Sequence, residues 1–400
     1  MNQKLFESCL NIDCQAPEQD LTESLSSLPT DRGVLLFADE NNRPVQLLIT
    51  ANIRRTALAR LSSKDSETRS KKTDITAITR KIFYLPCYCN FKSALKHYRI
   101  ARAIYHDTYQ EFAKYGRQSY AVIDPSSNWP FFSIVSKPTA SQHKKVFGPF
   151  PSRKAASVFV QALHEIFSIC RMPELVDSPE KAKSCPYLQM KTCPAPCSDN
   201  ITRAEYLQQV NAAIGAASGN LAPYKDQLRR TMKSLAENMQ FEQAQSAKNR
   251  LRQLETLSKN TYSWITDLSD LAILHIDRSA KIAEEGKRRK IRTYAPFLIR
   301  SGHIIELDDF RIEKIEKLHR SLTNCLQNAP RQIPAKQLAE ELALTTCFLY
   351  RNKRPGIWLN CSRRSAGEYT IPTAEDIRSA IEQMENPPAN SHHNTANTGR

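Results

Sequence analysis

Two short apolar runs form the clearest pattern near the start of the chain. Residues 34–37 and 45–49 flank the turn-rich segment DENNRP, and this arrangement predicts a β-hairpin. The stretch ANIRRTALARL that follows predicts a helix with a basic face. Residues 1–28 are polar and mixed, so we interpret them as a loose leader without the apolar segment of a signal peptide.

The next segment alternates between helical and strand-like patterns. Residues 91–115 predict a helix, and SYAVID and PFFSIVS predict strands. VFGPFPS is typical of a turn. RKAASVFVQALHEIFSIC then predicts an amphipathic helix, and ITRAEYLQQVNAAIGAA a further helix. The residues placed on one face of the amphipathic helix are Ala156, Val160, Leu163 and Phe167.

Residues 224–257 contain no glycine and keep a helical spacing of apolar positions. The phase of this spacing shifts near NMQF, which favours two antiparallel helices over one continuous rod. The apolar positions before and after the shift are Leu228, Met232, Leu235, Met239, Phe241, Ala244, Ala247, Leu251 and Leu254.

The remainder of the chain predicts a further mixed region and a tail. DLAILHID and FLIRSGHIIEL are strand-like, and the basic segment GKRRKIR between them is typical of a solvated loop. The last residues are poor in apolar side chains and predict disorder. We therefore expect an α+β protein with these parts: leader 1–28, α/β lobe 29–112, linker 113–220, helical hairpin 221–260, reduced α/β region 261–385 and disordered tail 386–400.

Charge and glycine content narrow the possible functions. The formal net charge of +16 favours a polyanionic partner, with nucleic acid first and a merely soluble or ribosome-adhering basic protein as the alternative. The 10 glycines never form Gly-x-Gly, and no Gly-Lys-Ser/Thr is present, which argues against dinucleotide and P-loop sites. No apolar run reaches the length of a membrane span, so we expect a cytoplasmic protein.

Four cysteines cluster in the middle of the chain. They are spaced Cys170-x14-Cys185-x7-Cys193-x3-Cys197. In a reducing compartment this clustering favours a metal site over disulfides, with zinc and an iron–sulfur cluster as the two candidates. The alternative is four buried free thiols. We interpret the other seven as ordinary residues: Cys9, Cys14, Cys87, Cys89, Cys325, Cys347 and Cys361.

A basic and aromatic stretch is the candidate DNA-binding surface. Residues 75–106 contain no Asp or Glu, and their cations alternate with Tyr84, Tyr88, Phe91 and Tyr98. This composition suits phosphate contacts and base stacking, whereas the alternative is a solvated helix face over an aromatic core. The predicted DNA-binding residues are Arg54, Arg55, Arg80, Lys81, Lys92, Lys96, Arg99 and Arg102.

Three segments, in order, resemble the N-terminal half of the UvrC family, the excinuclease component of bacterial nucleotide excision repair. Residues 33–61 resemble a GIY-YIG nuclease domain. VFGPFPSRKAASVFVQALHEIFSIC with CPYLQMKTCPAPCSDNITRAEY resembles the family's FGPF turn, helix and cysteine run. Residues 224–257 resemble the UVR motif, with its core at residues 238–244.

The resemblance implies a metal-dependent nuclease lobe whose catalysts are absent here. Gly33 is retained, but the family's two tyrosines fall on Leu35 and Gln46, its arginine on Thr56 and its metal-binding glutamate near Tyr98. We therefore expect a pseudo-nuclease. The alternative is an active single-incision endonuclease that uses Mg²⁺ or Mn²⁺ with replacement residues Arg54, Arg55, Asp107 and Glu111.

The resemblance also implies a cofactor and a partner. The cysteine cluster would hold a 4Fe–4S cluster, with structural zinc as the alternative, and would connect the lobe to the hairpin. The hairpin would bind a UvrB-like protein, although the chain departs from the family pattern after Ala244. The residues expected to carry this contact are Leu228, Met232, Leu235, Met239, Phe241, Ala244 and Leu251.

Two further expectations concern the rest of the chain. A regulatory interaction protein without any DNA role is the third functional alternative. Full UvrC proteins continue into an RNase H-like nuclease and helix-hairpin-helix DNA binders, whereas we expect residues 261–385 to be a scaffold without chemistry. Its carboxylates are accordingly interpreted as surface residues: Asp267, Asp270, Asp277, Asp308 and Asp309.

Overall fold

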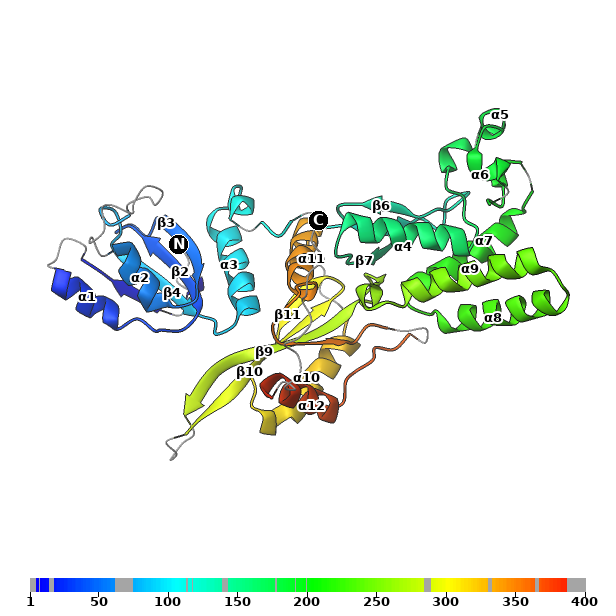
Figure 1. The fold of residues 1–400 in the computed structure, drawn as a ribbon. Helices are drawn as coiled ribbons and strands as arrows, with labels where there is room; N and C mark the ends of the chain where they lie inside the picture. The colour runs from blue at the N-terminus through cyan, green and yellow to red at the C-terminus, as the bar shows by residue number, and fades with distance from the viewer. Residues whose placement is uncertain are drawn as a thin grey trace, which may run out of the picture.

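Three antiparallel four-stranded sheets organise the described part of the chain (Figure 1). The computed structural model describes residues 5–6, 8–13, 18–61, 75–112, 114–116, 118–138, 143–176, 178–190, 192–198, 200–283, 289–329, 333–363 and 367–386. Cys14, the charged segment 62–74, the first three residues of GKRRKIR and the tail from residue 387 lie outside these residues. Within them, no helix combines the length and apolar character needed to span a bilayer.

The N-terminal sheet confirms the predicted hairpin. Its order is β1 (Ser8–Asn11), β4 (Lys81–Pro86), β2 (Gly33–Ala38) and β3 (Pro44–Thr50). Helices α1 (Glu18–Ser26) and α2 (Ile53–Leu61) contribute to the core that contains Leu35 and Phe37 of β2. Helix α3 (Asn90–Ile104) covers the opposite face, where Val34 and Leu36 point, since successive strand residues face opposite sides.

Part of the segment expected to be a loose leader is structured. Strand β1 pairs with β4 in antiparallel register, with Ser8 opposite Tyr84. Leu21, Leu25 and Leu28 are buried around helix α1. Most residues of the leader are polar, so its overall composition gives no sign of these leucines. Their spacing nevertheless forms one apolar stripe, which packs on the sheet.

Helix α3 is shorter than the pattern over residues 91–115 predicts. It ends at Ile104, His106 has a φ of 25°, and a 3₁₀ turn covers Tyr109–Glu111. Thr108 Oγ1 donates to the Tyr105 carbonyl at 3.3 Å. Asp and Thr side chains compete for backbone hydrogen bonds in this way, which favours turns over continued helix.

The middle sheet has the order β6 (Ser133–Val135), β5 (Tyr120–Ile123), β7 (Lys145–Gly148) and β8 (Thr266–Asp267). The predicted turn VFGPFPS therefore begins as strand, because Phe147 pairs with Ala121 and Asp267. Helix α4 (Arg153–Ile166) follows, with the Ser152 side chain accepting from Ala155 N at 3.1 Å. Together with helix α7 (Arg203–Ala217), it forms a second core around Phe150, Phe159 and Tyr206.

The predicted helical hairpin is present. Helices α8 (Ala222–Glu237) and α9 (Phe241–Leu257) pack against each other, and the chain reverses through Asn238, Met239 and Gln240. Helix α9 buries Ala244, Ala247, Leu254 and Leu257, and it also contacts α4. The phase shift near NMQF is therefore a correct signal for the break.

The C-terminal sheet has the order β11 (His303–Glu306), β10 (Lys290–Arg300), β9 (Ala272–Ala283) and β12 (Ile357–Asn360). Helices α10 (Ile315–Gln327) and α12 (Ala374–Glu385) cover one face. Helix α11 (Ala335–Leu349) and the N-terminal helix α3 lie on the other face (Figure 1). Helix α3 is therefore enclosed between two sheets, and the chain as a whole is α+β.

Candidate DNA-binding and partner-binding surfaces

Three of the four positions aligned with nuclease catalysts share one face of the N-terminal sheet. Leu35 is fully buried among α2 residues, and Gln46 pairs with its sheet neighbour Phe37 on that face. Thr56 Oγ1 lies 2.6 Å from Thr50 Oγ1. Tyr98 lies on α3, against the opposite face. The structure therefore does not bring Tyr98 together with the other three positions.

Tyr98 instead joins a carboxylate from the C-terminal region. Its hydroxyl donates to Glu340 Oε2 at 2.8 Å, and Tyr109 donates to Glu340 Oε1 at 2.7 Å. Gln110 Nε2 donates to the same oxygen at 2.9 Å. Burial, reinforced by Glu340, raises the pKa of Tyr98, so the phenol remains a hydrogen-bond donor. Glu340 thus serves as a bridge between α11 and the N-terminal lobe.

The replacement catalysts suggested by the sequence are dispersed. Arg54 Nε donates to the Leu28 carbonyl at 2.7 Å, which engages it in the lobe's own packing. Arg55 is exposed on α2, whereas Asp107 and Glu111 are exposed beyond the end of α3. In the described residues, no three His, Cys, Asp or Glu side chains are grouped closely enough to hold a metal.

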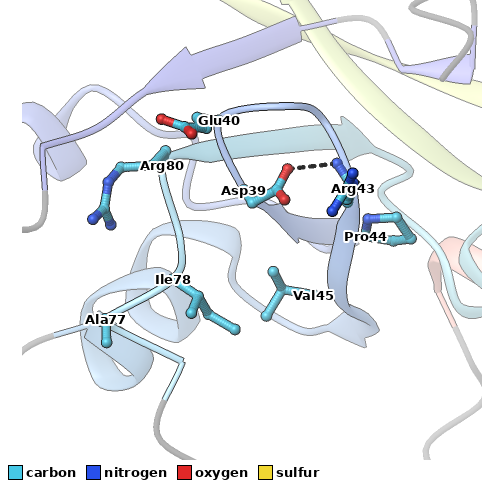
Figure 2. Close-up of a pocket in the computed structure, with 8 residues that line it drawn as sticks. All are labelled: Asp39, Glu40, Arg43, Pro44, Val45, Ala77, Ile78 and Arg80. Atoms are coloured by element: carbon cyan, nitrogen blue, oxygen red, sulfur yellow. Dashed lines mark hydrogen bonds between the residues drawn. The ribbon is translucent and has the colours of Figure 1, made fainter.

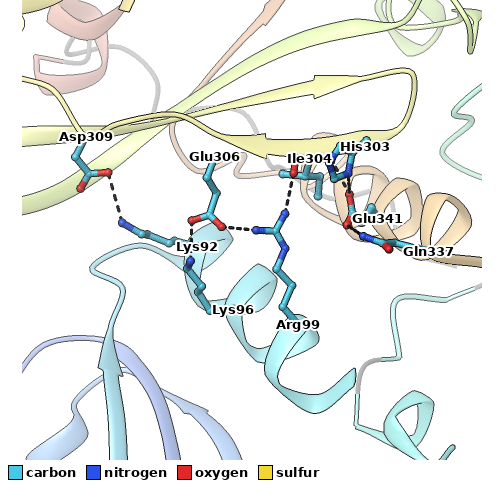
Figure 3. A network of polar contacts seen from close by, with 9 residues as sticks. All are labelled: Lys92, Lys96, Arg99, His303, Ile304, Glu306, Asp309, Gln337 and Glu341. Carbon is cyan, nitrogen blue, oxygen red and sulfur yellow. Dashed lines mark hydrogen bonds and ion pairs between the residues drawn. The ribbon is translucent and has the colours of Figure 1, made fainter. Parts of the chain in front are cut away.

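Three predicted DNA-binding cations on α3 form an internal polar clamp (Figure 3). Lys96 Nζ lies 3.0 Å from Glu306 Oε2, and Arg99 binds the other Glu306 oxygen. Arg99 also donates to the Ile304 carbonyl at 2.8 Å, and Lys92 lies 3.4 Å from Asp309. These half-buried cations already face protein carboxylates, which compete with phosphate for the same positive charge.

The other predicted cations have mixed surroundings. Lys81 Nζ donates to Asn42 Oδ1 at 2.9 Å, whereas Arg102 is half-buried on α3. Arg80 lies at the rim of a 530 Å³ cavity (Figure 2). That cavity is lined by two acidic and two basic side chains with four apolar ones: Asp39, Glu40, Arg43, Pro44, Val45, Ala77, Ile78 and Arg80. Because its acidic and basic side chains are equal in number, the cavity has no excess positive charge to attract a polyanion.

The aromatic residues of α3 are core residues, in agreement with the alternative interpretation. Phe91 is fully buried, and its ring meets those of Phe297 and Phe348 edge to face at 5.0 and 5.2 Å. His275 and Trp358 complete this cage. Tyr88, which precedes α3, is exposed, with 38% of its surface accessible.

Three of the four clustered cysteines lie near one another. The proximity of the Cys170 thiol lowers the pKa of Cys193, and Cys197 is close enough to affect Cys170 electrostatically. Cys185 is buried at the start of α6 (Pro186–Gln189). Soft thiol donors suit zinc or iron–sulfur chemistry. The four cysteines therefore provide suitable ligand atoms for either cofactor. In the described residues their thiols are not grouped closely enough to hold a metal, so binding would require them to move closer together.

The helical hairpin presents two exposed apolar side chains at its turn. Met239 is 78% exposed and Phe241 is 68% exposed. The other predicted contact residues are more enclosed, because Ala244 is buried and Leu228 packs against the middle core. Met232, Leu235 and Leu251 are half-buried. The structure thus divides the predicted set into an exposed tip, Met239 and Phe241, and a largely internal remainder.

The interpretation of the C-terminal aspartates as surface residues is wrong for two of them. Asp267 is 6% exposed and lies 3.2 Å from Lys145, because its short strand β8 joins the middle sheet. Asp277 is 7% exposed beneath α3, where burial raises its pKa. Asp308 is exposed, as expected, and pairs with Lys317.

Comparison with known proteins was decisive for the middle of the chain. A family profile described as the middle domain of UvrC/Cho excinucleases matches residues 119–216. UvrABC system protein C of Caldicellulosiruptor saccharolyticus is 22% identical over 308 residues, or 74% of this chain and 48% of that protein. The Helicobacter pylori G27 protein of the same name is 24% identical over 263 residues, or 64% and 43%. The chain is a UvrC-family protein.

The family similarity has defined limits. The protein of this name from Syntrophus aciditrophicus is 34% identical over 134 residues, which is 33% of this UvrC-family chain and 21% of that protein. The chain thus spans about half or less of the length of these curated relatives. No solved structure matches it. The profile match runs from β5 through α7 and includes all four clustered cysteines.

Sequence reasoning missed the acidic side of the clamp in this UvrC-family chain. Glu306 and Asp309 receive the α3 cations, and Glu341 anchors the edge beside them (Figure 3). Glu341 is fully buried and accepts from His303 Nδ1 and Ile304 N, both at 2.7 Å. The one available signal was charge: a stretch without acids at 75–106 and the acidic segment ELDD at 306–309.

Proposed function

We propose that this UvrC-family chain is a DNA-binding adaptor of nucleotide excision repair that does not itself cut DNA. The observation that carries the proposal is the composition of the face where the nuclease catalysts would lie. A buried hydrocarbon at Leu35, an amide at Gln46 and a hydroxyl at Thr56 replace the expected tyrosines and arginine. The adaptor would contact DNA through its positive charge and a UvrB-like protein through its hairpin.

The chemistry of phosphodiester hydrolysis explains why this face is unsuited to catalysis. A metal ion must be held by hard oxygen ligands, and a cation must stabilise the charge that develops on phosphorus. Leu35 offers neither, and the Thr56 hydroxyl is engaged with Thr50. Residues 75–106 supply no carboxylate, and Glu340, on the α3 side of the sheet, already accepts three hydrogen bonds.

DNA binding is supported by the net charge of +16 and is tested by its salt dependence. Binding that releases counterions from phosphates weakens steeply as salt rises, with a slope of about −0.9 in log K against log salt for each contact. We expect fluorescence anisotropy with duplex DNA to give a slope steeper than about −3. A flat dependence, or no binding at low salt, would favour the regulatory protein without a DNA role.

Partner binding is assigned to the hairpin tip. Exposed apolar side chains surrounded by charged neighbours are typical of interface anchors. Phe241 and Met239 fit this description, and the adjacent Glu242 is exposed in the first turn of α9. We therefore narrow the expected UvrB-like contact to the tip, with Leu235 and Met232 contributing along α8.

The cysteine cluster is assigned a structural iron–sulfur cluster, with zinc as the alternative. Cys170, Cys185, Cys193 and Cys197 would be its ligands, and the bound group would supply folding free energy rather than catalysis. Cys170 follows α4, and Cys197 precedes α7, so a shared ligand set would fix the segment between these two helices.

Replacing Cys193 by Ala should abolish stoichiometric metal binding. A site that loses one thiolate loses most of its affinity for a cluster or for zinc. We expect anaerobically purified wild-type chain to contain iron and to show the visible absorbance of an iron–sulfur cluster, and Cys193→Ala to lose both. Cys325→Ala is the matched control outside the cluster. Wild-type chain free of both iron and zinc would contradict the assignment.

A further inference from the structure

The β9–β10 hairpin continues beyond the C-terminal sheet as a two-stranded arm. Strand β12 pairs with β9 only over residues 273–276, and β11 pairs with β10 only over 297–300. An isolated bridge joins Tyr294 to Phe310. Past that point, the described residues 280–283 and 289–293 have only each other as strand neighbours, and we call them the arm. Figure 1 shows this part of β9 and β10 extending away from the helices.

The two faces of the arm differ in chemistry. Lys281 lies directly opposite Arg292, and Lys290 lies opposite Ala283, so these three cations share one face. Ile282 lies opposite Ile291 on the other face, and Ile282 is 45% exposed. Arg289 adjoins Lys290 and is exposed.

The positive charge of the arm is uncompensated within the described part of the chain. No carboxylate there lies within ion-pair distance of Lys281, Arg289, Lys290 or Arg292, whereas the α3 cations of the clamp meet Glu306 or Asp309. Among the described residues, Arg292 donates only to a backbone carbonyl, that of Ser279, at 3.3 Å. Like charges directly opposite each other destabilise a strand pair, so the Lys281–Arg292 arrangement is costly without an anion between them.

We infer that the arm is a binding surface for duplex DNA, with its cationic face on the phosphates. The inference rests on the proposed function and names the surface that carries it, in place of the α3 face. A two-stranded ribbon, with strands about 4.8 Å apart, fits the major groove of B-form DNA, which is about 12 Å wide. The deep, narrow major groove of A-form RNA does not admit it. Ile282, which is 45% exposed, leaves apolar surface on the opposite face of the arm.

The test removes the charge of the arm without changing its strands. The variant K281Q/R289Q/K290Q/R292Q is compared with R230Q/K248Q/R252Q/K259Q, which removes the same charge from exposed positions on or just after the helical hairpin. Circular dichroism and thermal melting establish that both variants remain folded. Anisotropy then gives the affinity of each protein for one B-form DNA duplex and one RNA duplex of the same sequence, across a salt series.

We expect the arm variant to bind DNA at least about tenfold more weakly at roughly 150 mM salt, with a slope shallower by about 0.9 for each lost phosphate contact. The affinity of the control variant on the helical hairpin for DNA should change less than about threefold. The arm variant should lose less affinity for RNA than for DNA. If wild-type chain binds DNA steeply and the arm variant binds equally well, the arm inference fails while the proposed function stands. If, in that case, the arm variant also self-associates, the role of these cations is to prevent the exposed strand edges from pairing with another chain. If the wild-type chain does not bind DNA, both fail.

Discussion

Phe91→Ala is expected to destabilise the chain by about 3–5 kcal/mol, the range for removing a fully buried aromatic side chain. Phe91 is 0% exposed, and its ring meets Phe297, Phe348 and Trp358 edge to face between 5.0 and 5.6 Å. These partners come from the C-terminal sheet and from α11. The substitution therefore opens a cavity at the junction of two lobes, where the lost contacts add to the lost burial.

Urea denaturation followed by intrinsic fluorescence measures this loss. The matched control is Phe112→Ala, because that ring is 43% exposed and stacks on Tyr105 alone among the described aromatic rings. We expect the control to cost less than about 1 kcal/mol. Limited proteolysis should also cut the Phe91→Ala variant near α3 first. If the two variants lost equal stability, α3 would not be the shared core element described above.

Phe241→Ala is expected to weaken binding to a UvrB-like partner by at least about 2 kcal/mol, or roughly 30-fold in Kd. The ring is 68% exposed at the start of α9, so the free chain should lose little stability when it is removed. Its full effect is therefore expected in the complex, where an aromatic anchor is desolvated by the partner.

Isothermal titration calorimetry with purified UvrB measures the effect. Phe112→Ala again supplies an exposed phenylalanine away from the hairpin, and it should bind like the wild-type chain. Met239→Ala tests the second residue of the tip and should show a smaller loss, since methionine is less often a dominant anchor. Unchanged affinity of Phe241→Ala for a partner that the wild-type chain binds would move the contact away from the tip.

Locally determined elements could be predicted from the sequence. The β2–β3 hairpin is evident because two apolar runs flank a turn-forming segment. The break between α8 and α9 is evident because the apolar phase shifts at Met239, whose φ of 58° reverses the chain. Both features depend on neighbours within a few residues, and period and turn chemistry report such neighbours directly.

The contacts that close α3 between the sheets could not be predicted in the same way. Arg99 and Glu306 are 207 residues apart, and Tyr98 and Glu340 are 242 apart. No periodicity links such distant positions, so a basic helix face with no nearby acids suggests a phosphate-binding face. The cysteine spacing identifies a candidate ligand set, but the arrangement of the four thiols depends on how α4 and α7 pack.

The placement of Tyr98 also depends on tertiary structure. Alignment to the nuclease pattern places the metal-binding glutamate near this residue, on the helix after the β-hairpin. The structure places that helix on the other side of the N-terminal sheet from Leu35. The face on which a helix packs is decided by its apolar stripe, and the α3 stripe is wide enough to serve two sheets, as Phe91, Leu95 and Tyr98 are all buried.

Strand scission is the measurement that tests the central claim most directly. Anaerobically purified chain is incubated with end-labelled nicked, bubble and lesion-bearing duplexes, with Mg²⁺ or Mn²⁺, in the presence and absence of UvrA and UvrB. Native and denaturing gels are run from the same reactions. The adaptor account predicts shifted complexes on the native gel and intact strands on the denaturing gel. A single metal-dependent cut by the chain alone would contradict it and direct attention to Arg54, Arg55, Asp107 and Glu111.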